Sequence, residues 1–79
     1  MNSKHYLKSR YYIEPNGFSS WFLRKEGSNT IIKKEKKRSR LVTYAEMHCP
    51  DDEFELRICD ANGLLEDIIP VKRCVEISA

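Results

Sequence analysis

Residues 39–63 have the sequence SRLVTYAEMHCPDDEFELRICDANG, and a change of hydrophobic period within them decides the fold. The first part has a helical period, with five side chains spaced so that they share one helix face: Leu41, Val42, Ala45, His48 and Cys49. Ser39 is predicted to be the N-cap of this helix. Because Pro50 disfavours helical geometry in the residue before it, we expect the helix to end near Cys49.

The second part of this stretch has the period of a strand. From residue 54 to residue 59 the chain alternates, with Phe54, Leu56 and Ile58 on one predicted face. Residues 60–63, DANG, are typical of a short hairpin loop, so a fifth strand is predicted over residues 64–69. Residues 71–77 fit either a further strand or a packed extension.

The N-terminal half shows the same alternation and predicts three more strands. The first covers residues 6–14, the second begins at Trp21, and the third covers residues 30–34. Turn residues separate them at 14–17 (EPNG) and 26–29 (EGSN). The predicted fold class is therefore α+β, with the order β-β-β-α-β-β, a single antiparallel-rich sheet and one helix packed on one face.

Two segments resemble the conserved pattern of a family of very small uncharacterised bacterial domains. Residues 21–27, WFLRKEG, are similar to its W-x-V-x-x-E-G segment, and residues 55–64, ELRICDANGL, to its E-L-x-V-x-x-x-D-G-x-I hairpin. The chain departs from the pattern in having Asn62-Gly63 for Asp-Gly and a basic cluster before the helix. Because the family has no settled activity, the resemblance implies a fold and not a function.

Composition excludes several classes of protein. Seventy-nine residues, 33% charged and 41% hydrophobic, form one small domain over residues 1–79, too small for an enzyme with a deep pocket. No nucleophile elbow, P-loop or His-Glu-x-x-His motif is present, so we expect a non-enzyme without a cofactor. Three widely spaced cysteines and two histidines do not predict a metal site. Without an apolar run of about 18 residues or a secretory signal, we expect a cytoplasmic protein with no membrane partner.

The charges are unevenly distributed along the chain. Residues 1–40 carry eleven Lys and Arg against three acids, whereas residues 41–79 carry three against nine. Six cations fall within residues 33–40, at the amino end of the predicted helix, where the helix dipole favours anions. The run is either an anion-binding surface, with nucleic acid as the commonest polyanion, or a solvated loop. Its cations are Lys33, Lys34, Lys36, Lys37, Arg38 and Arg40.

A second candidate surface is the sheet face opposite the helix. If Trp21, Leu23, Leu56 and Ile58 face the helix, aromatic and basic residues share the open face. That face can stack bases while pairing phosphates, pack across strands to stabilise the sheet, or meet a second copy of the chain. Its expected members are Tyr6, Lys8, Arg10, Tyr12, Phe22 and Arg24.

Two functional hypotheses follow from these surfaces. The first is an accessory domain that binds a polyanion through the basic run, with Tyr6, Lys8, Arg10 and Tyr12 as a second surface and with low sequence specificity. The second is a protein-interaction module or small regulator, which forms a homodimer or docks a partner. Its candidate residues are Phe22, Arg24, Asp51, Asp52 and Glu53.

Overall fold

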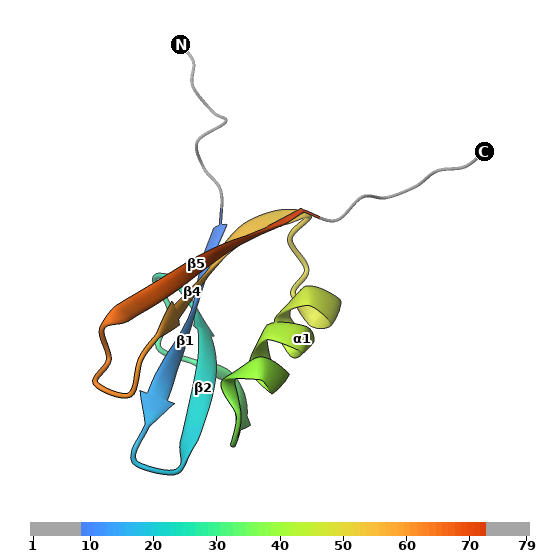
Figure 1. Ribbon diagram of the computed structural model, residues 1–79. Coiled ribbons are helices and arrows are strands. Elements are labelled where there is room, and N and C mark those ends of the chain that lie inside the picture. The colour runs from blue at the N-terminus through green and yellow to red at the C-terminus, as the bar shows by residue number, and fades with distance from the viewer. Residues whose placement is uncertain (1–8, 73–79) are drawn as a thin grey trace, which may run out of the picture.

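The computed structural model describes residues 9–72, which form a five-stranded mixed sheet with one helix on one face (Figure 1). The strands follow the order β3-β2-β1-β4-β5 across the sheet. This confirms the predicted α+β class, element order and single helix. The elements are β1 (Ser9–Asn16), β2 (Ser20–Lys25), β3 (Ile31–Glu35), α1 (Arg38–His48), β4 (Glu53–Cys59) and β5 (Leu65–Lys72).

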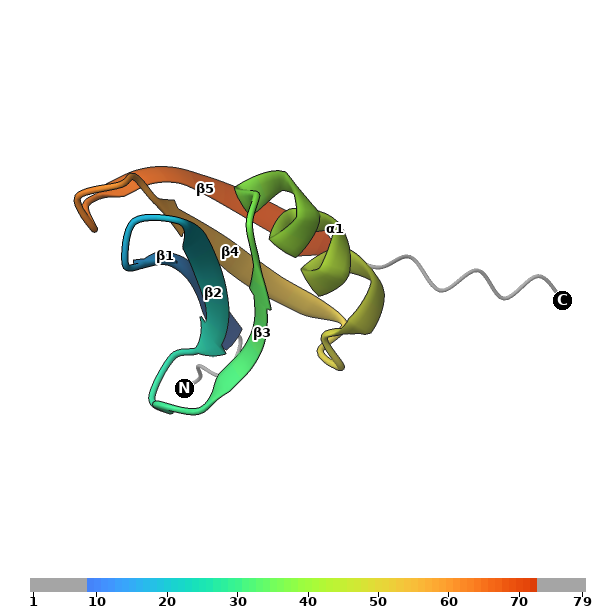
Figure 2. The same cartoon turned by 90° about the horizontal axis from the view of Figure 1, so that it is seen from below.

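The position of α1 follows from the strand directions. β1 and β4 are parallel neighbours, while β1–β2, β2–β3 and β4–β5 are antiparallel pairs. β3 and β4 therefore run in the same direction on opposite sides of the β1–β2 pair. Parallel strands need a crossover connection, and α1 provides it by passing over one face of the sheet (Figures 1 and 2).

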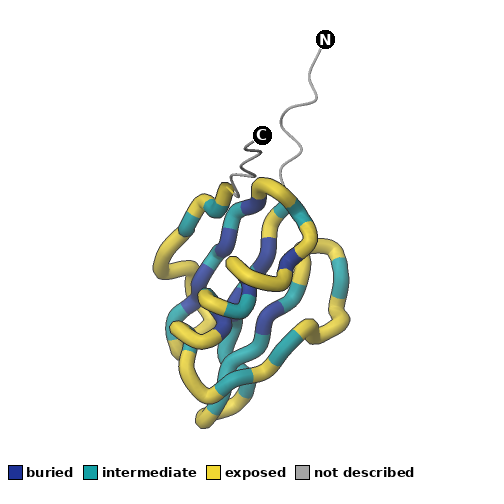
Figure 3. Tube along the Cα trace, turned by 90° about the vertical axis from the view of Figure 1, so that its right-hand side faces the viewer, coloured by how far each residue is buried: buried dark blue, intermediate teal, exposed yellow. Residues whose placement is uncertain are grey.

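The core lies between α1 and the face of the sheet that it covers. Leu41 and Ala45 of α1 are fully buried against alternate residues of the three central strands, among them Ile13, Leu23 and Leu56 (Figure 3). The strand residues predicted to face the helix do so, and Trp21 packs against the cluster while remaining half-buried. The alternation in the sequence thus identified the buried face of the sheet correctly.

The predicted N-cap is wrong. Lys37 occupies that position in an extended conformation (φ −123°, ψ 135°), without a side-chain capping bond, and the helix begins at Arg38. The carbonyl of Lys37 already accepts the N–H of Arg40 at 3.1 Å, so Ser39 lies inside the first turn. The helix starts early because the guanidinium of Arg38 is held by the carbonyl of Cys59, a contact that the local sequence cannot reveal.

The predicted end of the helix is confirmed. Cys49 is the C-cap, with φ −66° and ψ 136°, and its N–H donates to the carbonyl of Ala45. This extended conformation is the one that a following proline favours. His48 was expected to share the buried stripe with Cys49, and this was wrong, because His48 is exposed and Cys49 is buried.

Two predicted turns are confirmed and one is displaced. In the β4–β5 loop the side chain of Asp60 accepts the N–H groups of Asn62 and Leu64, and Gly63 has the positive φ (85°) that the loop requires. The 26–29 turn also separates β2 from β3. The 14–17 turn, however, lies later, because β1 continues to Asn16 and pairs there with Ser20.

Pro15 is tolerated within β1 because of where the parallel partner ends. β4 pairs with β1 only from Ser9 to Ile13, so beyond Ile13 that edge of β1 has no partner strand. Proline lacks the N–H that a fully paired strand would need. The expected positions Tyr6 and Lys8, and residues 73–77 of the ambiguous tail, lie outside the described residues, whereas Val71 and Lys72 belong to β5.

Candidate functional site

The basic run surrounds the start of α1, and the structure divides its cations into two groups. Glu35 pairs with Lys33 at 3.9 Å, and Glu66 of β5 pairs with Arg38 at 3.1 Å. The other four cations are exposed and form no ion pair with any residue of the range 9–72. They are Lys34, Lys36, Lys37 and Arg40.

Arg38 is engaged in contacts that hold the fold together. Its guanidinium donates to the carbonyl of Cys59 at 2.9 Å and to the carboxylate of Glu66, and lies 4.8 Å from the centre of the Trp21 ring. These contacts tie the start of α1 to the end of β4, to β5 and to β2. The geometry therefore gives Arg38 a structural role that the other cations of the run do not share.

No capping side chain or first-turn acid neutralises the positive potential of the helix dipole at the amino end of α1. The first turn contains no acidic residue, and the side chain of the N-cap Lys37 makes no capping bond. Unsatisfied N–H groups and the helix dipole together favour an anion at this end. Each exposed cation placed here costs about 0.3–1 kcal/mol of stability through the same dipole. A bound anion would reverse that cost.

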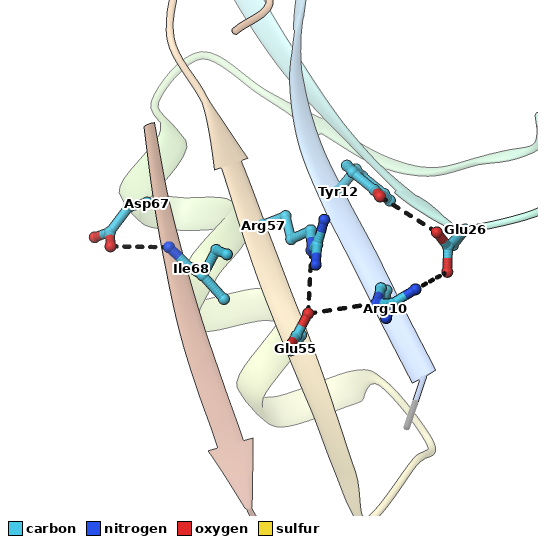
Figure 4. A network of polar contacts seen from close by, with 7 residues as sticks. All are labelled: Arg10, Tyr12, Glu26, Glu55, Arg57, Asp67 and Ile68. Carbon is cyan, nitrogen blue, oxygen red and sulfur yellow. Dashed lines mark hydrogen bonds and ion pairs between the residues drawn. The ribbon is translucent and has the colours of Figure 1, made fainter. Parts of the chain in front are cut away.

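Ion pairs fill the open face of the sheet, and Figure 4 shows part of this network. Arg10 pairs with Glu26 at 3.3 Å and with Glu55 at 3.4 Å, and the Nε of Arg57 donates to Glu55 at 3.0 Å. The hydroxyl of Tyr12 donates to Glu26 at 3.3 Å. Arg10 is thus matched by carboxylates on the β2–β3 turn and on β4, and Arg57 by a carboxylate on its own strand.

The ring of Tyr12 lies among these charges. Arg24 lies 4.7 Å and Arg57 5.9 Å from its centre. Arg24 also forms two hydrogen bonds with the carboxylate of Glu14, at 2.7 and 3.0 Å, which raise the pKa of the guanidinium. Arginine stacked on tyrosine and paired with glutamate is the arrangement of cross-strand packing. Of the three alternatives for this face, the geometry favours the one that stabilises the sheet.

The sequence did not predict the ion pairs of this face. Glu14, Glu55 and Arg57 alternate with core residues along β1 and β4, so the period of two already assigned them to the open side. What the sequence did not reveal is that β4 lies directly beside β1. That adjacency brings Glu55 within reach of Arg10 and so pairs a cation of this face with an acid.

The acidic segment that follows α1 is partly structural. The hydroxyl of Tyr11 donates to Asp51 at 2.6 Å, and Lys25 lies 3.6 Å from the same carboxylate oxygen. The hydrogen bond from Tyr11, together with the charge of Lys25, lowers the pKa of Asp51. Asp52 and Glu53 are exposed at the same end of the sheet.

The five residues expected to bind a partner lie in two separate places. Phe22 and Arg24 are half-buried on β2, whereas residues 51–53 lie where the chain passes from α1 into β4. Arg24 and Asp51 are each occupied by contacts within the chain. The structure does not bring this set together as one surface.

A groove of about 570 Å³ separates β3 from α1, beside the basic run. No part of the sequence analysis predicted it. The signal that could have found it is helical spacing, because Arg40, Tyr44 and His48 are each four residues apart on α1. Its lining residues are Lys33, Glu35, Ser39, Arg40, Thr43, Tyr44, Met47 and His48.

The cysteines offer no reactive centre within the described residues. Cys49 and Cys59 are buried and form no disulfide within residues 9–72, and burial raises the pKa of Cys59, so its thiolate is disfavoured. Cys74 lies outside the described residues. Within residues 9–72 no three His, Cys, Asp or Glu side chains gather as metal ligands would, and no helix there has the length and apolar character needed to cross a bilayer.

Comparisons with family models, with curated proteins and with solved structures found no match to this chain. The resemblance to the small bacterial domain family therefore stays a prediction. The class that the coordinates define is a small α+β protein with one sheet and one covering helix. Any function must be argued from the surface itself.

Proposed function

We propose that this chain is a small accessory domain that binds a polyanion, most simply nucleic acid, with low sequence specificity. The observation that carries the proposal is a group of three exposed cations at the start of α1, Lys36, Lys37 and Arg40, which have no ion-pair partner among residues 9–72. Lys34 is exposed too, but it lies opposite Phe22 in β3 and so projects from the other face of the sheet. Clustered lysine and arginine bind nucleic-acid backbone by releasing its condensed counterions. Lys33 and Arg38 adjoin this group, but each also has an acidic partner within the chain.

The placement of these three cations supports the proposal because it lowers the stability of the helix, and no ion pair among residues 9–72 offsets that loss. Lys36 and Lys37 occupy positions where an acid or a short polar side chain would stabilise the helix. Breaches of this kind occur where function competes with stability. The expected second surface contributes less, because Arg10 and Tyr12 are engaged with Glu26, and Tyr6 and Lys8 lie outside the described residues.

The test is a titration of short labelled single- and double-stranded oligonucleotides at several salt concentrations, read by fluorescence anisotropy. The variant is Lys36→Gln with Lys37→Gln, and the matched control is Lys34→Gln with Lys72→Gln, which removes two exposed cations away from the start of α1. We expect the first pair to weaken binding and to flatten the salt slope by about 0.7 per lost phosphate contact on a single strand. The control should keep most of the slope.

Two results would overturn the proposal. One is no binding of either oligonucleotide at the lowest salt. The other is an equal loss of affinity and slope in both double variants, which would make the interaction a response to net charge alone. Arg38 is left unchanged in this design because it anchors α1 to Cys59 and Glu66, so its replacement would confuse binding with folding.

A second candidate function, protein interaction, is supported by apolar side chains around the β4–β5 loop. Leu64, Leu65 and Ile68 are 64%, 50% and 40% exposed. Exposed apolar groups on one element often belong to an interface. Under this alternative, sedimentation would show a concentration-dependent dimer or a partner complex that Leu65→Lys abolishes and the Lys36 and Lys37 changes do not.

A further inference from the structure

The groove between β3 and α1 combines two kinds of chemistry in one place. On the β3 side and near the start of α1 lie the cations Lys33 and Arg40 and the hydroxyl of Ser39. Further along α1 lie Tyr44, Met47 and His48. The rings of Tyr44 and His48 are 4.4 Å apart between centroids, at 34° to one another.

The two cations of the groove are held differently. Lys33 lies 5.4 Å from the centre of the Tyr44 ring and 3.9 Å from the carboxylate of Glu35, so its charge is partly used within the chain. Arg40 is exposed and has no ion-pair partner among residues 9–72. A phosphate is therefore favoured beside Arg40 and disfavoured beside Glu35. This places an anion at Arg40, in the first turn of α1.

The aromatic part of the groove is open to a ligand. Met47 is 69% exposed and His48 is also exposed. Solvent therefore reaches the His48 ring of the Tyr44–His48 pair. Tyr44 is half-buried and packs against the core, which fixes the base of the pair. A free phosphate makes no use of rings, and an aliphatic ligand makes no use of Arg40. A nucleotide uses both, through its base and its phosphate.

The size and shape of the groove suit one nucleotide of a nucleic-acid strand. A volume of about 570 Å³ lies within the range of small-ligand sites, about 300–1,000 Å³. Several lining residues are exposed, including Thr43 and Met47, so the groove is shallow and does not enclose its occupant. Cations continue beyond it at Lys36 and Lys37, which precede α1. A single nucleic-acid strand can therefore pass through the groove and continue along Lys36 and Lys37.

We propose that this groove binds one nucleotide of a single-stranded nucleic acid, with the phosphate at Arg40 and the base stacked on the Tyr44–His48 pair. This inference rests on the proposed function and adds to it a preference for single strands. In a duplex the bases are stacked on one another and are not available to a protein ring. Stacking accepts any base, so the low sequence specificity is retained.

The test uses labelled oligothymidylate, a duplex of equal length and inorganic polyphosphate as probes, with His48→Ala and Tyr44→Leu as variants. Leucine keeps apolar volume against the core at position 44, and His48 is exposed, so its replacement does not endanger the fold. Tyr12→Leu on the open face is the control. We expect each groove variant to bind oligothymidylate about 5- to 150-fold more weakly, the range of one lost base stack, with the salt slope unchanged.

The outcomes separate the inference from the function on which it rests. Weaker binding in the groove variants, with normal circular dichroism and an unaffected Tyr12→Leu control, supports the inference. Tight binding to wild type that neither groove variant changes, or that only Tyr12→Leu changes, overturns it and leaves polyanion binding standing. Equal affinity for the three probes also overturns it. No binding of any probe overturns the proposed function as well.

Discussion

Replacing Tyr11 with Phe removes the hydroxyl that donates a part-buried hydrogen bond to a charged group. The hydroxyl donates to Asp51 at 2.6 Å and ties β1 to the segment that follows α1, forty residues away. The ring itself is 1% exposed and packs edge-on against Phe54, with 5.0 Å between centroids. Phenylalanine keeps that packing, so the variant isolates the hydrogen bond.

The expected loss follows from the charge of the acceptor and its exposure. A hydrogen bond to a charged group contributes about 1.5–3 kcal/mol to stability. The side chain of Asp51 is 28% exposed and keeps Lys25 at 3.6 Å, so water and that cation compensate in part. We therefore expect Tyr11→Phe to lower the free energy of unfolding by ~1–2 kcal/mol. In a domain of this size each kcal/mol corresponds to about 4–8 °C in Tm.

The pH dependence gives a second signature. The pKa of Asp51 is held below its usual 3.8, so its contribution to stability is present above pH 3.8 and is lost as the pH falls through the lowered value. Burial, followed by the hydrogen bond to Asp51, raises the pKa of Tyr11 above its usual 10.0, so that contribution is present below pH 10.0 and is lost as the pH rises beyond it. The stability difference between wild type and Tyr11→Phe should therefore be largest between these two values.

The assay is urea unfolding followed by the fluorescence of Trp21 at a series of pH values. Tyr12→Phe is the matched control, because its hydroxyl also meets a carboxylate, Glu26, but at 3.3 Å and on an exposed face. We expect the control to change stability by less than about 0.5 kcal/mol, as exposed surface changes do. Equal losses in the two variants, or a difference for Tyr11→Phe that does not vary with pH, would refute the reasoning.

Three further predictions concern stability. Lys37→Asp should stabilise the fold by about 0.5–2 kcal/mol by supplying the missing N-cap and should weaken oligonucleotide binding. Lys36→Asp supplies no cap, so it should stabilise the fold by only about 0.3–1 kcal/mol through the helix dipole while it also weakens binding; thermal melts and anisotropy test both. Gly63→Ala should lower the free energy of unfolding by about 1–2 kcal/mol, because φ at this position is 85°. Nothing lies within 4 Å of the added Cβ, so the loss comes from backbone strain alone. Gly63→Asn should lower stability less in the same melts. Leu56→Ala removes a fully buried side chain and should cost about 2–5 kcal/mol; retention of a cooperative melt near the wild-type Tm would contradict this.

Much of the fold could be predicted because its signals are local. The period-two alternation around Ile13, Leu23 and Leu56 identified both the strands and their buried face. Pro50 correctly ended the helix, and residues 60–63 correctly formed the hairpin loop. The misplaced N-cap shows the limit, because Ser39 satisfied the local rule while Arg38 was held by a partner on β4.

The candidate site could likewise be predicted only in part. The clustering of cations before the helix was visible in the sequence, since all of them fall within eight residues. The sequence did not show which of these cations are paired. Glu66 pairs with Arg38 although the two residues are 28 positions apart, and the pairing of Glu35 with Lys33 depends on the geometry of β3. The groove at Tyr44 and the ion pairs of the open face likewise depend on which elements lie side by side.

The sequence by itself determined the type of each element, the buried face of each strand and the concentration of positive charge near residues 33–40, because each of these depends on neighbours a few positions away. Only the tertiary structure decided that β4 lies parallel to β1, that Tyr11 meets Asp51, and that Arg10 is paired with Glu55 on the open face. Those contacts join residues far apart in the chain. Their partners are chosen by strand order and helix placement, which no local pattern specifies.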